Sequence, residues 1–321
     1  LTLETVNLAM ISRSPVGLQD LNLTSRTLQV QGQVYDGKSV WTGGHSANAW
    51  SDWRNWNATG GRPGMDSAQS IASGDTASLN SGSVALTVAL PGTRLDLAGL
   101  SLAGSGGVSL NGGGTIAMSG SLGVTASGGT HSVDATFVLA QPTVFNVGTG
   151  SKLTITGLVS GGTAGAGLSK EGAGTLVLNA GYTTMADTFV KAGLLQLGSG
   201  SGAPSLGDAS SLDRTINLSL GARVAFNVSQ NIVLPNLIVT GEGAADGISS
   251  INSDYTVTWK NGSSERRIQA GESVNAGTLT LALGGSLASA TLGVSAGATL
   301  NAQAGSVLPG ATVLTADGLV N

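Results

Sequence analysis

The side chains that could do acid–base or metal chemistry are few in this chain and widely separated. His45 and His131 are the only two histidines, and both stand among glycine, serine and other small residues. Imidazole is a common general base and metal ligand, but a lone histidine in such a segment is more often a solvated turn residue. We therefore expect both histidines to lie in solvent. Cysteine is absent, which excludes thiolate ligands, and we expect no bound metal ion or cofactor.

Paired carboxylates are the second chemistry to consider, because glycoside hydrolysis requires two acids that flank one bond. The aspartates in the first half of the chain stand singly among small polar residues, and no pair forms a clear cluster; they include Asp66, Asp75, Asp96 and Asp134. The sequence therefore predicts a protein that is not an enzyme. A polysaccharide-acting enzyme is kept as the least favoured alternative.

Four of the five tryptophans lie close together in the sequence, at Trp41, Trp50, Trp53 and Trp56. Indole rings can stack on sugar rings, or they can close one end of an apolar core. Nearby glycine and asparagine residues leave room for a short helix at most. We interpret residues 41–69 as a compact cap or loop, with glycan contact by these tryptophans as the alternative.

The elements that would position these residues are short strands. Of the 321 residues, 40% are hydrophobic, 10% are charged and 51 are glycine, which argues against both disorder and helices. From about residue 70, apolar residues recur as doublets, such as Leu95/Leu97, Leu100/Leu102, Val108/Leu110 and Leu176/Leu178. Each doublet is a minimal strand with two inward residues. Three strands and their turns make a unit of about 20 residues, the size of one coil of a β-solenoid.

We therefore predict an all-β protein whose residues 70–240 form a β-solenoid. A pair of antiparallel β-sandwiches is the alternative, although sandwich strands are usually longer. Residues 1–40 are expected to form an N-terminal β-strand extension. Residues 241–321 are expected to form a C-terminal β region, either further coils or a small sandwich-like cap. Within it, Gly241–Gly247 reads as a linker, and Asn261-Gly262 after a strand-like segment predicts a β-hairpin.

One stretch of the chain resembles a known family. The segment LSKEGAGTLVLNAGYTTMADTFVKAGLLQLG, residues 168–198, is similar to the autotransporter-associated β-strand repeat of bacterial passenger domains. The matching positions are Leu168, Lys170, Gly172, Gly174, Thr175, Leu176, Leu178, Thr188, Val190, Gly193, Leu194 and Leu197. The central turn at residues 182–185 departs from the family pattern. The tryptophan segment, followed by Pro63 and Asp66, also resembles the start of such proteins. The resemblance implies a right-handed parallel β-helix, secretion and surface display, and it implies no particular ligand.

The N-terminal extension suggests how such a protein could assemble. Its apolar residues alternate nearly with period two, as a strand requires, at Leu1, Leu3, Val6, Leu8 and Met10. A solenoid has open ends, and an open strand edge tends to recruit another strand. Our first hypothesis is a self-assembling subunit of a bacterial surface filament or layer, in which these residues exchange into a neighbouring copy. The alternatives are an extension that caps its own solenoid, and a monomeric adhesin passenger that binds glycans or other surface ligands.

The first residue, the charged residues and the length of the apolar runs bear on where the protein is located and on its other partners. The chain begins with Leu1 rather than methionine, which suggests cleavage of a secretory signal and an extracellular, cell-surface location. The formal net charge is -4 and the basic residues are scattered, so the sequence shows no footprint for nucleic acid. No apolar run reaches the roughly 18 residues that a membrane helix needs, and we expect no membrane span.

Overall fold

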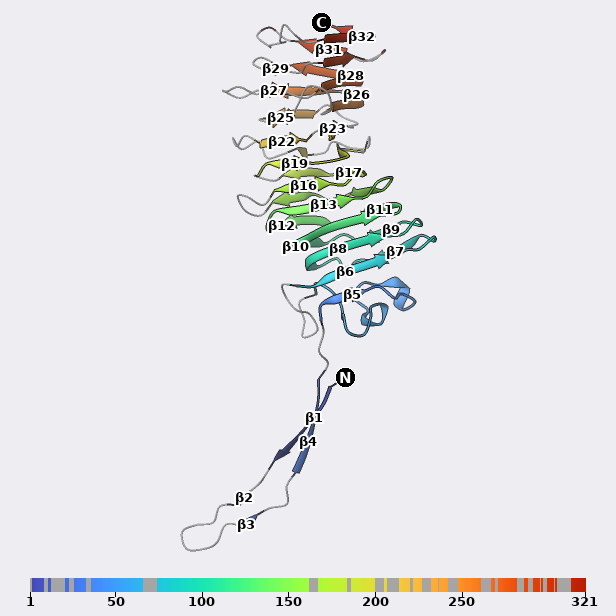
Figure 1. The fold of residues 1–321 in the computed structure, drawn as a ribbon, viewed down its shortest axis with the longest axis vertical. Coiled ribbons are helices and arrows are strands. Elements are labelled where there is room, and N and C mark those ends of the chain that lie inside the picture. The colour runs from blue at the N-terminus through green and yellow to red at the C-terminus, as the bar shows by residue number, and fades with distance from the viewer. Residues whose placement is uncertain are drawn as a thin grey trace.

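The computed structural model shows an all-β protein whose parallel strands stack as a β-solenoid, and this confirms the predicted fold class (Figure 1). The structure describes residues 36–65, 74–161, 167–183 and 186–199 continuously. In the remaining segments it describes shorter stretches, most of them single strands. Among the described residues the helical elements are two 3-10 turns, η1 (Ser46–Asn48) and η2 (Trp53–Asn55).

Each coil contributes one short strand to each of three stacks, which we call faces A, B and C. Face A contains the first half of β8 (Arg94–Ala103), the first half of β10 (Thr115–Ser127), β12 (Thr136–Leu139), β15 (Val159–Gly161), β18 (Gly181–Thr183) and β21 (Ser205–Leu206). Face B contains β5 (Lys38–Val40), β6 (Thr76–Asn80), the second halves of β8 and β10, β13 (Thr143–Val147), β16 (Leu168–Glu171), β19 (Thr188–Val190), β22 (Arg214–Leu218) and β25 (Leu237–Gly241). Face C begins with β7 (Leu86–Ala89), β9 (Val108–Asn111), β11 (Thr130–Val133), β14 (Lys152–Ile155), β17 (Thr175–Leu178), β20 (Leu194–Leu197) and β23 (Arg223–Phe226).

The register between coils shows why the apolar doublets recur. On face C, His131 pairs with Leu153, and Leu153 pairs with Leu176, which is 23 residues further on. One coil is therefore about as long as predicted from the sequence. The paired residues form two inward columns, and those with described burial are almost fully buried: Val108, His131, Leu153, Leu176, Leu195 and Val224 in one, and Leu110, Val133, Ile155, Leu178 and Leu197 in the other. Each strand buries its doublet only because the next coil covers it.

The C-terminal region continues this parallel stack. Face C extends through β26 (Ile248–Lys260), β28 (Gly271–Leu281), β30 (Thr291–Val294) and β32 (Val313–Ala316). Three further strands belong to the same region: β27 (Arg267–Ile268), β29 (Ser286–Leu287) and β31 (Thr299–Ala302). The preceding β24 (Ile232–Pro235) pairs in parallel with β26. The short β33 (Leu319–Val320) pairs with β31. Of the two forms expected for this region, the structure shows further coils.

The hairpin predicted at Asn261-Gly262 is wrong. The preceding strand residues, Thr256 to Trp259, pair in parallel with Thr278 to Leu281 one coil later. The local turn signal favours an antiparallel return, but a strand inside a stack already finds parallel partners on the coils beside it. Coil stacking therefore overrides the dipeptide. Asn261 and Gly262 lie outside the described residues, as does most of the predicted linker after Gly241.

The N-terminal extension forms a sheet of its own. β1 (Thr2–Leu8) pairs antiparallel with β4 (Arg26–Gly32), and β2 (Ile11–Ser12) pairs antiparallel with β3 (Leu21–Asn22). Neither pair is joined to a solenoid strand among those that the structure describes. Figure 1 shows β1 and β4 lying apart from the stacked coils, beyond β5. We call residues 1–32 the N-terminal hairpin.

The stacking predicts a large and local cost for removing one inward side chain. Leu153 is fully buried between its neighbours on adjacent coils. We expect Leu153→Ala to lower the free energy of unfolding by about 2–5 kcal/mol, because it leaves a cavity in a closed column. Thr154→Ala, on the outward side of the same strand, is the matched control and should change it by less than about 0.5 kcal/mol. Equal effects in chemical denaturation would contradict the assignment of inward and outward residues.

Candidate functional site

The tryptophan segment closes the β5 end of the solenoid. Trp50 and Trp56 are buried and belong to the continuous apolar core, and Trp41 packs against it. The Trp56 ring meets Trp50 and Trp41 edge to face, with centroid distances of 4.7 and 4.9 Å. Both indole N–H groups are satisfied, since Trp50 Nε1 donates to Pro63 O at 3.0 Å and Trp56 Nε1 donates to Trp50 O at 2.8 Å. We call residues 41–57 the tryptophan cap.

The cap is attached to the first strand of face C by its backbone. Ala49 forms an isolated parallel bridge with Ala89, and the Trp50 N–H donates to Ala89 O at 2.8 Å. These contacts occupy the outer edge of β7 beside Ala89, which would otherwise end in unpaired backbone groups. The cap therefore covers core side chains and also takes up part of a strand edge.

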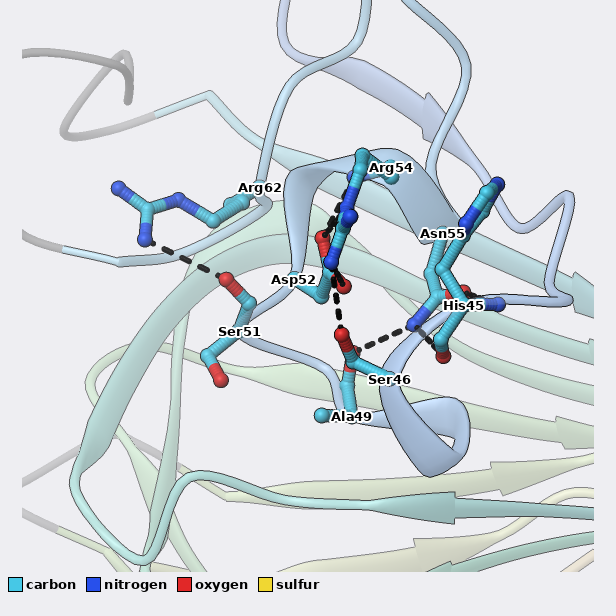
Figure 2. A network of polar contacts seen from close by, with 8 residues as sticks. All are labelled: His45, Ser46, Ala49, Ser51, Asp52, Arg54, Asn55 and Arg62. Atoms are coloured by element: carbon cyan, nitrogen blue, oxygen red, sulfur yellow. Dashed lines mark hydrogen bonds and ion pairs between the residues drawn. The ribbon is translucent and has the colours of Figure 1, made fainter.

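A buried amide holds the cap loop together, as Figure 2 shows. Asn55 is fully buried, and its Nδ2 donates to His45 O at 2.9 Å and to Ala49 O at 3.0 Å. Its Oδ1 accepts the His45 N–H at 2.8 Å. Because all of these groups are paired, the buried amide carries no desolvation penalty from a missing partner. It fixes the loop conformation instead.

One outer surface of the cap is rigid and exposed. Arg54 donates to both carboxylate oxygens of Asp52, at 2.7 and 3.0 Å, and to Ser46 Oγ at 2.8 Å (Figure 2). The hydrogen bond from Arg54 holds the pKa of the Asp52 carboxyl well below its usual range. The adjoining Ser46–Asn48 turn is left-handed, with φ of 37°, 50° and 58°, a conformation that is rare for residues with a side chain. Trp53 lies on the same turn as Arg54, and its side chain is 56% exposed.

The four tryptophans considered as glycan contacts thus separate into two groups. Trp50 and Trp56 are enclosed by the core and present no face to a sugar, and Trp41 packs against that core. Trp53 alone is broadly exposed among the four. Sequence spacing did not separate these roles, because the order of core and surface residues in an irregular loop follows no period.

The two histidines occupy different surroundings, and the expectation that both are solvated is wrong for His131. His45 is exposed in the cap loop. His131 is fully buried in an inward column of face C, between Val108 and Leu153. Its Nδ1 accepts the Val108 N–H at 3.1 Å, which leaves Nε2 protonated to donate to Ser127 O at 3.0 Å. The glycine-rich flanks hid this position, but the register with the apolar residues one coil later could have revealed it.

Lys170 is a second buried polar residue in an inward column. It pairs with Phe145 on one side and Val190 on the other, and it is fully buried. Its Nζ donates to the carbonyls of Glu171, Gly172 and Ala192 at 2.8, 2.7 and 3.1 Å. Burial lowers the pKa of the ammonium to about 8, opposed by the Glu171 charge. The Lys170 side chain therefore links the corner of its own coil, the turn after β16, to the corner of the next coil, the turn after β19.

The carboxylates considered for catalysis are scattered over the structure. Asp75 is buried and accepts the Gly64 N–H at 2.9 Å. Asp96 pairs with Arg94, and Asp134 accepts the Thr156 hydroxyl at 2.9 Å. Asp66 lies outside the described residues. Within the described part of the chain, no three His, Asp or Glu residues are grouped so as to hold a metal ion.

The residues predicted to exchange lie in or beside β1. Leu3, Val6 and Leu8 belong to this strand, whereas Leu1 and Met10 fall outside the described residues. The register pairs Val6 with Leu28 and Leu8 with Arg26. By strand alternation, Val6 and Leu8 therefore share one side of the N-terminal hairpin, and Leu3 belongs to the other.

Comparisons with protein-family models, with curated proteins and with solved structures found no match to this chain. None of them names the autotransporter-associated repeat, so that resemblance stays a prediction from the sequence. Several of its positions have a visible structural role. Leu168, Leu176, Leu178 and Leu197 are buried, and Gly172 has a φ of 71° where a Cβ would meet Val147 O at 2.3 Å. Among the described residues, no helix is long and apolar enough to cross a membrane.

The two environments in the cap predict opposite outcomes for two tryptophan substitutions. Trp50→Ala should lower the free energy of unfolding by about 3–5 kcal/mol, because it empties the end of the core. Trp53→Ala should change it by less than about 0.5 kcal/mol, because that ring is largely in solvent. Chemical denaturation of both variants tests this. A Trp53→Ala protein as unstable as the Trp50→Ala protein would show that the exposed ring also supports the cap.

His131 predicts a pH dependence of stability. Burial lowers its pKa from the usual 6.5, an effect that the hydrogen bond to Ser127 partly opposes. The unfolded chain therefore takes up the proton first, and the contribution of neutral His131 is complete above pH 6.5 and is lost as the pH falls below it. We expect the free energy of unfolding to fall between pH 7 and 5.5, by at most about 1.4 kcal/mol per pH unit.

Two variants isolate this contribution. His131→Leu should flatten the stability profile over the same window, because no imidazole remains to take up a proton. His45→Ala should keep the profile of the unsubstituted protein. If the His131→Leu protein retains the same slope, another group is responsible for it.

Proposed function

We propose that this protein is a non-enzymatic extracellular structural protein, a subunit that assembles with copies of itself into a bacterial surface filament or layer. The N-terminal hairpin would add its strands to a neighbouring copy. One observation carries the proposal: β1 and β4 form a sheet of two strands that pairs with no described strand of the solenoid. The likeness of residues 168–198 to a repeat of secreted bacterial proteins supports the extracellular location.

A two-stranded sheet needs a further partner. An isolated β-hairpin is at best marginally stable in water, and independent stability requires a third strand or a packed face. Each strand of the N-terminal hairpin has one edge paired within the hairpin and one outer edge. Such an edge presents alternating N–H and C=O groups that a strand of another molecule can pair with. Addition of a strand across molecules satisfies both requirements.

The two sides of the N-terminal hairpin differ in composition, and this difference fits docking to a neighbouring copy. On one side the register brings together Val6, Leu8, Leu28 and Val30, with Glu4 and Arg26 opposite two of them. On the other side Leu3 stands among threonine, asparagine and glutamine. Four of the eight positions on the first side are apolar, and covering them is favourable. Burial of these apolar residues therefore favours docking, and backbone pairing at the strand edge fixes the orientation of the docked copy.

The alternative in which the extension caps its own solenoid is less well supported. The end of the solenoid beside the extension is already covered, since Asn57 of the tryptophan cap bonds the N–H and C=O of Val40 in β5, and the cap also attaches to β7 on face C. The hairpin would have to compete with the cap for the same edges. Addition to another copy involves no such competition.

If the acceptor lies at a different place on the neighbour from the hairpin, the contact is heterologous and need not close. Contacts of this kind produce open filaments rather than rings when the rotation between copies does not close. This is why a fibre is the expected form of the assembly.

A glycan-binding adhesin is the second candidate function. The observation that favours it is the exposed Trp53 ring beside the Arg54 guanidinium, which Asp52 and Ser46 hold in place. An aromatic face with a fixed donor beside it is a common arrangement for binding sugars or other polar ligands. The acids considered for a polysaccharide-acting enzyme each contact a different group: Asp75 accepts the Gly64 N–H, Asp96 pairs with Arg94, and Asp134 accepts the Thr156 hydroxyl.

Deletion of residues 1–32 tests the proposal. We expect the full chain to form uniform fibres in negative-stain electron microscopy and large particles in light scattering. The deleted protein should remain monomeric, because the donor strands are absent. Its far-UV circular dichroism and unfolding midpoint should match those of the unassembled full chain, since the solenoid keeps its own cap.

A substitution provides a finer control. Thr5→Pro removes one backbone N–H in the middle of β1 and should prevent fibres, whereas Thr5→Ser should leave them unchanged. Fibres from the protein lacking residues 1–32 would contradict the role of the hairpin. A full chain that stays monomeric at all concentrations would contradict self-assembly itself.

A further inference from the structure

Two shallow hollows follow one another along the outside of face B, and we call the two together the groove. It follows one outward column, in which six successive strands place Thr76, Gly99, Gly123, Val144, Ser169 and Phe189. Gly99 and Gly123 have no side chain to fill the column between Thr76 and Val144; both are buried, and Leu122 packs beside Gly99. Gly123 is also required by the backbone, because its φ is 69° and a Cβ there would meet Val144 O at 2.3 Å.

Two hollows lie on this column and adjoin each other. The first has a volume of about 310 Å³ and extends over β6, β8 and β10; the second has about 300 Å³ and extends over β13, β16 and β19. Because β10 pairs directly with β13, the hollows follow one another along the same face. Six strands spaced by about 4.8 Å give the groove a length of roughly 24 Å. This length suits a chain-like ligand better than a single small molecule.

The lining combines apolar surface with hydroxyl groups. Leu122 borders the first hollow and is 64% exposed, and Phe189 borders the second and is 47% exposed. Ser78, Ser101 and Thr125 add hydroxyl-bearing side chains to the first hollow. In the second hollow, the Ser169 Oγ is shielded from solvent and has no hydrogen-bond partner in the structure. An orphaned buried hydroxyl is costly and indicates a missing partner.

We propose that this groove binds a neutral, linear glycan. A pyranose ring has an apolar face that can stack on Phe189 and hydroxyl groups that can both donate to and accept from Ser169. A purely apolar side chain from another protein would leave the Ser169 hydroxyl unpaired. A repeating sugar chain also matches a groove whose wall repeats once per coil.

Charge narrows the class of glycan. Asp187 is the one charged residue among those that line the two hollows, and it is acidic. No basic residue lines either hollow, so the lining offers no opposite charge to an anionic polysaccharide. The groove therefore favours uncharged sugars. This inference does not depend on the N-terminal hairpin, so it can hold or fail separately from the proposed assembly.

Binding of defined oligosaccharides tests the inference on the protein that lacks residues 1–32 and, as assembled fibres, on the full chain. The probes are the β-1,4-linked and α-1,4-linked hexamers of glucose, their trimers, and a galacturonate hexamer as the anionic counterpart. We expect at least one neutral hexamer to bind by saturation-transfer NMR and calorimetry, more tightly than its trimer. The galacturonate hexamer should not bind.

Two substitutions locate the site. Phe189→Ala should weaken binding of the neutral hexamer by at least about fivefold, because the stacking face is lost. Ser169→Ala should weaken it by about threefold or more, because one hydrogen bond is lost. Val84→Ala removes another exposed apolar side chain, which lines neither hollow. It is the matched control and should leave the affinity unchanged.

Three kinds of result would overturn the inference. The first is that neither neutral hexamer binds at about 10 mM. The second is a wrong site or a wrong ligand: Phe189→Ala leaves the affinity unchanged, or the galacturonate hexamer binds more tightly than the neutral ones. The third is that no sugar binds but Phe189→Ala reduces lateral association of the protein, which would assign the groove to a second copy of the chain.

Discussion

Parallel pairing of each coil with the next is the constraint on which the whole molecule depends. A single coil contributes one thin layer of inward residues and cannot enclose them. Leu153 is buried only because His131 and Leu176 lie on the coils at either side of it. The same pairing gives the stacked strands their backbone hydrogen-bond partners, so the core and the backbone hydrogen bonds form together. The ends, corners and outer faces are all consequences of this stack.

The stack also tolerates polar residues inside, provided that their partners come from the backbone. His131 and Lys170 both occupy inward columns of otherwise apolar residues. His131 joins the N–H of Val108 on one coil to the carbonyl of Ser127 at the adjoining corner, and Lys170 binds carbonyls from two successive corners. These carbonyls lie at the ends of strands and in the turns that follow, and the Ser127 carbonyl also accepts the Gly104 N–H at 3.1 Å. The two buried side chains therefore find acceptors for their own N–H groups in the backbone, which removes the cost of burying an unpaired polar group.

The sequence was sufficient to predict the parts of the fold that repeat. Apolar doublets such as Leu176/Leu178 indicate a strand by themselves, and their recurrence after about 20 residues indicates stacking. It failed where a residue's environment depends on register across coils. His131 looks like a turn residue from its glycine-rich neighbours, and its inward position appears only when it is aligned with Leu153. The hairpin signal at Asn261-Gly262 failed for the same reason, since its strand partner lies one coil away.

The two candidate sites also differ in how far the sequence predicts them. The tryptophan cap could be anticipated because its residue types are unusual, but which indoles lie inward could not, because an irregular loop has no period. The groove on face B could not be seen at all from composition. It arises because Gly99, Gly123 and Ser169 happen to share one outward column. Small residues are common throughout this chain, and only their alignment across coils makes a hollow.

The two proposals use different parts of the stack, and this separation has a consequence. Growth through the N-terminal hairpin engages a strand edge, whereas the proposed glycan groove lies on an outer face. An assembly built in this way leaves face B uncovered on every subunit. A filament would then present many identical grooves along its length, and weak binding at each would add through multivalency. A shallow groove of modest affinity is therefore sufficient on a polymer, although it would be inadequate on a monomer.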